Sequence, residues 1–171
     1  MIRYSRGVLG LLLAAAAPAA LLAQREGPPT EGSIRIGASR YDLSSTGTGA
    51  SLNAGLTLPL AGRTVFLEPS IGILRITTAF GHHSSWLFPE LTAQVQQGLG
   101  AVRPYLGGGI GTGTTGLSGV AHWKFTLLAL AGARVHLAGR WGVRGEVRLR
   151  SVDPWVGHTA DFGVGFTHGG R

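Results

Sequence analysis

The sequence contains little charge and no cysteine. Only 13% of its 171 residues are charged, about half the share of a typical soluble domain, and Lys124 is the single lysine. Without cysteine the chain forms no disulfides and carries no lipoprotein anchor. Long apolar runs are scarce as well. A membrane-spanning helix needs about 20 apolar residues in succession, and only the N-terminus comes near this length.

Glycine, by contrast, is abundant. The chain has 29 glycines together with 44% hydrophobic residues and a mean hydropathy of +0.22. Each interior glycine costs a helix about 1 kcal/mol relative to alanine, so this content argues against long helices. The composition therefore predicts a single apolar, strand-rich domain.

The N-terminus has the layout of a secretory signal peptide. Arg3 and Arg6 form a basic start, and an uncharged stretch rich in Leu and Ala follows as far as Ala23. A basic region followed by an apolar region and small residues is typical of an export signal. We expect cleavage after Ala23. The alternatives are cleavage after Ala19 and an uncleaved membrane anchor.

Apolar and polar residues alternate through the rest of the chain. Between Ala50 and Leu60 every even-numbered residue is Ala or Leu, whereas the odd-numbered ones are Ser, Asn, Gly, Thr and Pro. Period two marks a strand with one apolar and one polar face. Most of these segments approach or exceed the roughly 9–11 residues of a transmembrane strand. Seven further segments alternate in this way: 33–39, 65–74, 86–96, 102–110, 123–137, 140–150 and 161–167.

The connections between these segments alternate in length, as in outer-membrane barrels with short periplasmic turns and longer outer loops. Short turns with glycine are expected at 61–63, 98–101 and 138–139, and longer polar loops at 77–85, 112–121 and 151–157. The sequence therefore predicts an all-β fold, an eight-stranded antiparallel transmembrane β-barrel. The predicted organisation is a signal peptide (1–23), a disordered leader (24–32), the outer-membrane barrel (33–167) and a short tail (168–171).

Period two alone does not show which face lies inside, because a soluble periplasmic lipocalin-like barrel would bury its apolar face. The polar face here consists mostly of Gly, Ser and Thr, whereas a soluble surface is about 25–35% charged. Aromatic residues also lie on the apolar face near strand ends, as in the girdles of membrane barrels. Both features favour the membrane barrel over the soluble one. The predicted girdle is Trp123, Phe125, Trp141 and Phe166.

The chain resembles the small bacterial outer-membrane β-barrel proteins, the OmpA/OmpX/OmpW-like barrel domain group. The resemblance covers residues 33–167 and rests on the signal, the eight alternating strands, the loop asymmetry and the aromatic last strand. It implies an outer-membrane location and a partnership with the barrel-assembly machinery. Barrels of this group usually end in an aromatic residue, which Phe166 matches, but residues 168–171 follow it here.

Charges of both signs fall on the face that such a barrel turns inward. An isolated buried charge is very costly, so these residues are expected to pair. We interpret them as a salt-bridge network that plugs the lumen, and the alternative is the gate of a narrow channel. The residues are Glu68, Glu90, Arg103, Arg134, Arg144, Glu146, Arg148 and Asp161.

Two further groups lie near the expected outer ends of strands. Arg40 and Arg75 fall on the apolar face, where they are expected to contact lipopolysaccharide phosphates unless the alternation simply ends there. His83 and Ser85, with Glu90 nearby, resemble the Ser/His/acid site of outer-membrane lipid A deacylases. By parity, however, Glu90 points inward.

The predicted function is a structural or surface-interaction role in the bacterial cell envelope. The alternatives are a lipid A-modifying or lipolytic enzyme and a narrow channel. No cofactor, metal or catalytic residue is predicted. The run from Gly111 to Gly116 matches a dinucleotide-binding fingerprint by letter, but it lacks the helix and the acidic residue of that motif. We expect a monomer that contacts outer-membrane lipid and lipopolysaccharide. Nucleic acid is not an expected partner, because the charges are dispersed.

Overall fold

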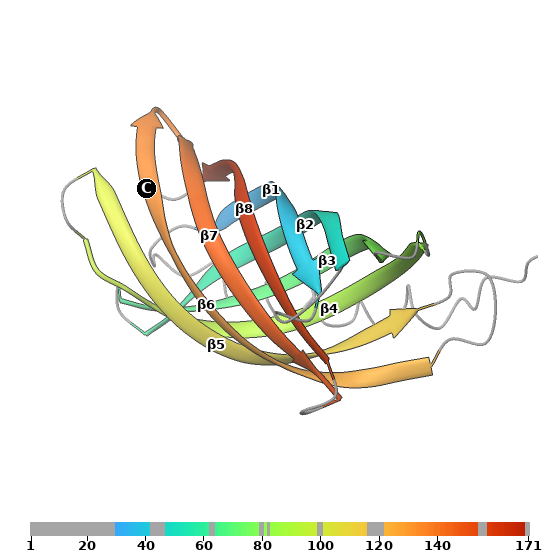
Figure 1. Ribbon diagram of the computed structural model, residues 1–171. Coiled ribbons are helices and arrows are strands. Elements are labelled where there is room, and N and C mark those ends of the chain that lie inside the picture. The colour runs from blue at the N-terminus through green and yellow to red at the C-terminus, as the bar shows by residue number, and fades with distance from the viewer. Residues whose placement is uncertain are drawn as a thin grey trace, which may run out of the picture.

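In the computed structural model the chain forms eight β-strands that close into a barrel (Figure 1). The structure describes residues 30–41, 47–61, 64–78, 81, 83–98, 101–115, 122–153 and 157–169. The predicted signal peptide lies outside these residues, and among them no helix is long and apolar enough to cross a membrane. The strands are β1 (Glu31–Tyr41), β2 (Gly47–Ala61), β3 (Val65–Thr78), β4 (His83–Gln96), β5 (Val102–Thr115), β6 (His122–Ala138), β7 (Trp141–Val152) and β8 (Gly157–Gly169).

The barrel is antiparallel throughout. Each strand pairs with the next along the chain, and β8 pairs with β1 to close the sheet. At the closing seam, Glu31 lies opposite Gly169 and Tyr41 opposite Thr159. The strands range from 11 residues in β1 to 17 in β6, whereas strands of soluble proteins usually have about five or six. The predicted fold class is confirmed.

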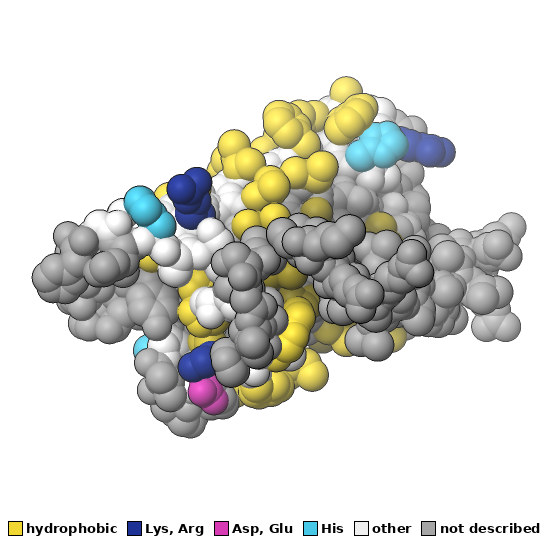
Figure 2. All heavy atoms as spheres, turned by 90° about the vertical axis from the view of Figure 1, so that its right-hand side faces the viewer, with side chains coloured by type: hydrophobic (Ala, Val, Ile, Leu, Met, Phe, Trp, Pro, Cys, Tyr) yellow, Lys and Arg dark blue, Asp and Glu magenta, His cyan; other side chains and the backbone are white. Residues whose placement is uncertain are grey.

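The two faces of the sheet are inverted relative to a soluble barrel. Ile34 and Ile36 on β1 are 62% and 64% exposed, whereas Arg35 between them is 3% exposed. Large apolar side chains are exposed on all eight strands, and most buried side chains are polar or charged. Figure 2 shows the apolar side chains gathered on the outer wall, with cationic and histidine side chains towards its two ends. This distribution contradicts the lipocalin-like alternative.

The four predicted girdle residues lie on the outer wall. Trp123 and Phe125 are each 45% exposed at the start of β6, and Trp141 and Phe166 are 55% and 65% exposed at the start of β7 and near the end of β8. Because β6 and β7 run antiparallel, these two pairs flank the apolar wall at opposite ends. Such positions suit rings with one wet edge at a membrane interface.

The predicted bounds of the longer outer loops are wrong. β3 continues to Thr78 and β4 begins at His83, so strand occupies most of the expected loop at 77–85. β5 continues to Thr115, into the expected loop at 112–121. The polar residues at the ends of β3 and β5 do not form loop, because they continue the strands beyond the apolar wall. The barrel therefore carries short connections at both ends, which leaves little loop for an adhesive surface.

The first and last strands of the chain also extend past their predicted ends. β1 begins at Glu31, inside the predicted leader, and β8 ends at Gly169, inside the predicted tail. The amide of Gly169 donates a hydrogen bond to the carbonyl oxygen of Arg140 at 2.9 Å. This contact ties the last residues of β8 to the turn between β6 and β7.

The end of the lumen nearer the longer predicted loops is filled by an apolar cluster, here called the apolar cap. It consists of Leu74, Ile76, Phe88 and Val152, with Trp86 packed against them. The rings of Trp86 and Phe88 stack with their centroids 5.7 Å apart. Gly113 makes room for this cluster, because a Cβ there would lie 2.5 Å from the Phe88 ring.

Candidate functional site

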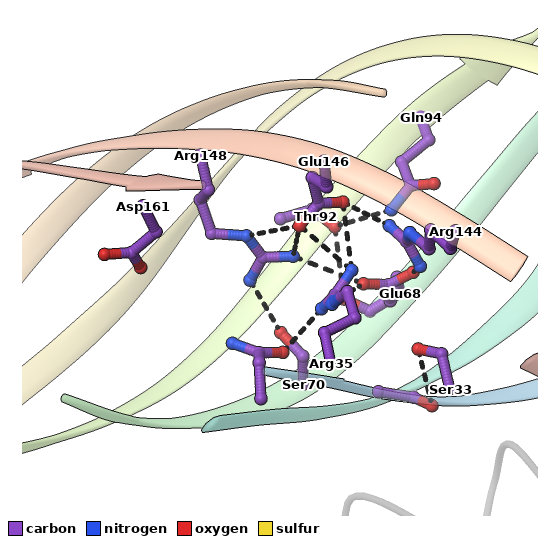
Figure 3. Close-up of polar contacts among 12 residues, drawn as sticks. Ser33, Arg35, Glu68, Ser70, Thr92, Gln94, Arg144, Glu146, Arg148 and Asp161 are labelled. Atoms are coloured by element: carbon purple, nitrogen blue, oxygen red, sulfur yellow. Dashed lines mark hydrogen bonds and ion pairs between the residues drawn. The ribbon is translucent and has the colours of Figure 1, made fainter. Parts of the chain in front are cut away.

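The lumen holds a cluster of ion-paired side chains, here called the lumen network (Figure 3). Its members come from β1, β3, β4, β6, β7 and β8, and strand alternation turns each of them inward. Five arginines balance five carboxylates, so the network carries no net charge. The members are Arg35, Arg134, Arg144, Arg148 and Arg150 with Glu31, Glu68, Glu90, Glu146 and Asp161.

Glu68 on β3 lies at the centre of the lumen network. Its side chain is fully buried, and its Oε2 accepts a hydrogen bond from Nη1 of Arg144 at 2.5 Å. Three more arginines reach the same carboxylate, Arg35 at 3.3 Å, Arg148 at 3.3 Å and Arg134 at 3.5 Å. One carboxylate therefore holds four guanidinium groups from three strands.

Glu146 and Tyr105 form a second focus. Glu146 pairs with Arg35 at 2.9 Å, with Arg148 at 3.0 Å and with Arg144. The Tyr105 hydroxyl donates to Oε2 of Glu146 at 2.9 Å and accepts from Nε of Arg144 at 2.5 Å. The Arg144 guanidinium also lies 4.7 Å from the Tyr105 ring centroid, a favourable cation–π distance. The aromatic ring thereby becomes part of the polar cluster.

Gly132 on β6 makes the position of Tyr105 possible. Gly132 lies directly opposite Tyr105 on β5 and Glu146 on β7. A Cβ at this position would approach the Tyr105 hydroxyl oxygen and the Gly145 carbonyl oxygen to 2.4 Å each. Because real Cβ contacts are never this short, any other residue would displace the ring or the backbone.

Towards the apolar cap, the lumen network continues through Glu90. Glu90 pairs with Arg148 and Arg150, and Arg150 also pairs with Asp161. The Arg150 guanidinium lies 5.0 Å from the ring centroid of Phe88, a member of the apolar cap. The ionic and apolar layers are therefore in direct contact.

At the opposite end, the network reaches the start of β1. Nη1 of Arg134 lies 3.3 Å from the Glu31 carboxylate. Nη2 of Arg134 donates to the Thr57 hydroxyl at 3.1 Å and to Oε1 of Gln94 at 3.0 Å. Thr57 in turn donates to Glu68 at 2.9 Å. Polar contacts thus run continuously from one end of the lumen to the apolar cap.

The structure brings together seven of the eight residues predicted for this site: Glu68, Glu90, Arg134, Arg144, Glu146, Arg148 and Asp161. The prediction for Arg103 is wrong. Its side chain is exposed at the start of β5, and no described carboxylate lies within ion-pair distance of it. Parity alone does not show that this position lies at the mouth of the barrel, where water rather than a carboxylate solvates the charge.

Three members of the lumen network, and Tyr105 which contacts it, are not among the predicted site residues. Arg35 and Arg150 lie on the polar face of their segments, so parity carried the signal needed to include them. Glu31 was assigned to the leader. Parity places Tyr105 on the inward face, but its contact with the charged residues depends on the glycine opposite it.

Arg40 and Arg75 are exposed on the outer wall. Arg40 on β1 lies opposite Thr48 of β2, and Arg75 on β3 lies opposite Ala50 of β2. The two arginines therefore flank β2 on the same side of the barrel. Neither forms an ion pair with a described residue.

His83, Ser85 and Glu90 do not assemble into a Ser/His/acid site. His83 and Ser85 lie opposite Thr77 and Arg75 on the outer wall, and the Thr77 hydroxyl is 2.9 Å from Nδ1 of His83. Glu90 is buried on the other face of the sheet and paired with two arginines of the lumen network. The strand itself separates the carboxylate from the histidine.

Comparisons with solved structures identify the same fold. Neisserial surface protein A is 12% identical with a TM-score of 0.64, over 84% of this chain and 97% of that one. Ail, the attachment invasion locus protein of Yersinia pestis, is 13% identical with a TM-score of 0.61, over 84% and 99%. The outer membrane enzyme PagL is 15% identical with a TM-score of 0.52, over 81% and 98%. No protein-family model and no curated protein matches the sequence.

Proposed function

We propose that the protein is a non-conducting, non-enzymatic β-barrel of the bacterial outer membrane with a structural or surface-interaction role in the cell envelope. The filled lumen carries this proposal. The charge-balanced lumen network and the apolar cap occupy the interior in series, so an ion crossing the barrel would have to separate buried ion pairs and then pass an apolar layer. Either step opposes conduction.

Three observations support the location. The wall is apolar on all eight strands, aromatic residues flank it at both ends, and barrels of this fold in the comparisons include named surface and outer-membrane proteins. The N-terminal export signal is consistent with such a location. The short turns of outer-membrane barrels lie in the periplasm. With that orientation, the start of β1, the end of β8 and the turn at Gly139–Arg140 all face the periplasm.

Electrical silence is the direct test of the proposed function. Purified, refolded protein added to a planar lipid bilayer is expected to produce no discrete current steps, under conditions in which a known porin does. If the lumen network is instead the gate of a narrow channel, small steps in the current are expected. Reproducible steps that disappear when the protein is left out would contradict the proposal.

Lipopolysaccharide is the partner we propose for the outer end of the wall. Arg40 and Arg75 are exposed and without a described acidic partner, where guanidinium groups reach lipid phosphates. The double variant Arg40→Gln/Arg75→Gln is expected to co-purify with several-fold less lipopolysaccharide than wild type, measured by phosphate assay on the detergent extract. Equal amounts would exclude this contact.

The same extracts test the enzymatic alternative. Mass spectra of lipid A from cells with and without the protein are expected to show the same acyl chains, because Glu90 is separated from His83 by the sheet. Loss of an acyl chain that depends on Ser85 would overturn the non-enzymatic reading.

A further inference from the structure

A small recess lies at the periplasmic mouth of the barrel. It is lined by the start of β1, the start of β5, the turn between β6 and β7, and the end of β8, and it has a volume of about 20 Å³. One water needs about 10–15 Å³ by this measure, so the recess admits only a small group at the end of a ligand. The charged and aromatic side chains and the histidine that line it are Glu31, Arg103, Arg134, His136, Arg140 and Trp141.

The recess carries an excess of positive charge. Arg103, Arg134 and Arg140 line it, and Glu31 is its single acidic residue. The Glu31 carboxylate is already paired with Arg134. Arg103 and Arg140 are exposed, and no described carboxylate lies within ion-pair distance of either. Two guanidinium groups therefore remain without a counter-charge at one small opening.

Strand register concentrates this charge. Arg103 on β5 lies directly opposite Arg134 on β6, which in turn lies directly opposite Arg144 on β7. Like charges directly opposite one another destabilise a sheet. The lumen network compensates Arg144 and Arg134, but it does not extend to Arg103. An anion bound beside Arg103 would complete the compensation of this row.

Arg134, which lines the recess, has a buried donor without a hydrogen-bond partner. Arg134 is 6% exposed, and its Nε is buried without a hydrogen bond, although its other nitrogens contact Glu31, Thr57 and Gln94. A buried donor left unsatisfied destabilises the folded state. Oε1 of Glu31, which also lines the recess, is likewise buried without a hydrogen bond. The Arg134–Glu31 pair is therefore not fully satisfied by the chain itself, and a bound group with an acceptor oxygen would satisfy the Arg134 donor.

We propose that this recess binds a carboxylate of an acidic cell-wall peptide. The assignment of this mouth to the periplasm rests on the proposed function. Guanidinium groups bind carboxylates through paired, charge-assisted hydrogen bonds. The recess admits only the end of a ligand, so a single carboxylate suits it better than a bulky lipid headgroup. Arg103 and His136 also lie on the inward-facing positions of their strands, away from surrounding lipid.

Calorimetry on refolded protein in zwitterionic detergent tests the site directly. The probe is a cell-wall tetrapeptide with free carboxylates, compared with the same peptide amidated at those carboxylates. The free peptide is expected to bind at least about tenfold more tightly than the amidated one. The variant Arg103→Gln/Arg140→Gln is expected to weaken binding by at least about tenfold. Neither arginine belongs to the lumen network, so the barrel should stay folded.

The matched control is Arg40→Gln/Arg75→Gln, which removes the same charge at the opposite end and is expected to leave peptide binding unchanged. Equal affinity for the amidated peptide, or absence of binding by folded protein, would overturn the proposal. Stronger binding of inorganic phosphate or phosphatidylglycerol than of the peptide would overturn it in favour of a phosphate ligand.

The side of the membrane is tested separately from binding. The chain has no cysteine, so a single Ala101→Cys substitution in the exposed turn before β5 provides a unique label. We expect an impermeant thiol reagent to label it only after the outer membrane is permeabilised. Labelling on intact cells would overturn the periplasmic assignment while leaving the calorimetric result intact.

Discussion

The substitution Glu68→Ala is expected to destabilise the barrel by about 3–5 kcal/mol or more. Glu68 is fully buried and faces four arginines, so its removal leaves a net positive charge in an interior that water barely reaches. Urea unfolding in phospholipid vesicles, followed by tryptophan fluorescence and by heat-modifiable migration on gels, would measure the loss. Failure to refold is the extreme form of the same result.

A second substitution separates the charge of Glu68 from its shape, and an exposed ion pair provides the control. Glu68→Gln keeps the side-chain volume and is expected to lose most of the same stability. Asp153→Ala serves as the control, because Asp153 pairs with Lys124 at 3.4 Å with both side chains well exposed, and such pairs are worth about 0–1 kcal/mol. If Glu68→Ala and Asp153→Ala unfold at the same urea concentration, the lumen network does not stabilise the fold.

Charge balance gives a further test within the same measurement. Glu68→Gln/Arg144→Gln restores neutrality and leaves two amides in contact distance. This double variant is expected to be more stable than the sum of the single losses predicts, because neighbouring residues in one network couple. Strict additivity would show that Glu68 and Arg144 act independently despite the 2.5 Å contact between them.

The fold was predictable because one signal, period two, is strong and local. Alternation over 50–60 fixes which side chains share a face of β2, and it does so without knowledge of any other strand. Parity likewise turned Glu68, Glu146 and Arg148 to the same side of the sheet. Closure of the barrel then brings inward charges of opposite sign close together, away from water, so their pairing follows from the fold.

Three features depended on information that parity does not contain. The predicted strands end several residues before the observed ones. Polar residues such as Thr77 and Thr114 continue a strand once the neighbouring strands supply hydrogen bonds. Arg103 was placed with the lumen charges, although depth along the barrel rather than face decides its environment. Tyr105 acts in the network because a glycine faces it across the sheet, and such complementarity appears only once the register is known.

The filled lumen also limits which surfaces can carry a function. With short connections at both ends and no open pathway through the middle, molecules can meet this barrel at its wall, at its outer rim or at its periplasmic mouth. The wall is apolar and matched to lipid. Among the residues that the structure describes, the arginines without an ion pair are divided between the two ends, Arg40 and Arg75 at one and Arg103 and Arg140 at the other. Partners of the proposed kind are therefore expected at the rims rather than inside.

The substitution Ile110→Arg tests whether the wall faces lipid. Ile110 is 53% exposed near the middle of β5, and an arginine at the centre of the apolar wall is expected to cost about 2–4 kcal/mol in a bilayer. Leu60→Arg is the matched control, since Leu60 is 62% exposed but lies at the turn end of β2, where the cost falls to about 0–1 kcal/mol. Urea unfolding in phospholipid vesicles would measure both.

The difference in unfolding free energy between Ile110→Arg and Leu60→Arg distinguishes a membrane barrel from a soluble one. Water solvates an arginine equally well at either position on a soluble barrel, so a soluble protein would show changes within about 0.5 kcal/mol for both variants. Lipid makes the cost depend on depth, because the charged head at position 60 can reach the interface whereas the one at position 110 cannot. Equal stability of the two variants would contradict the membrane assignment, and with it the reason that the charges of this chain are gathered inside the barrel.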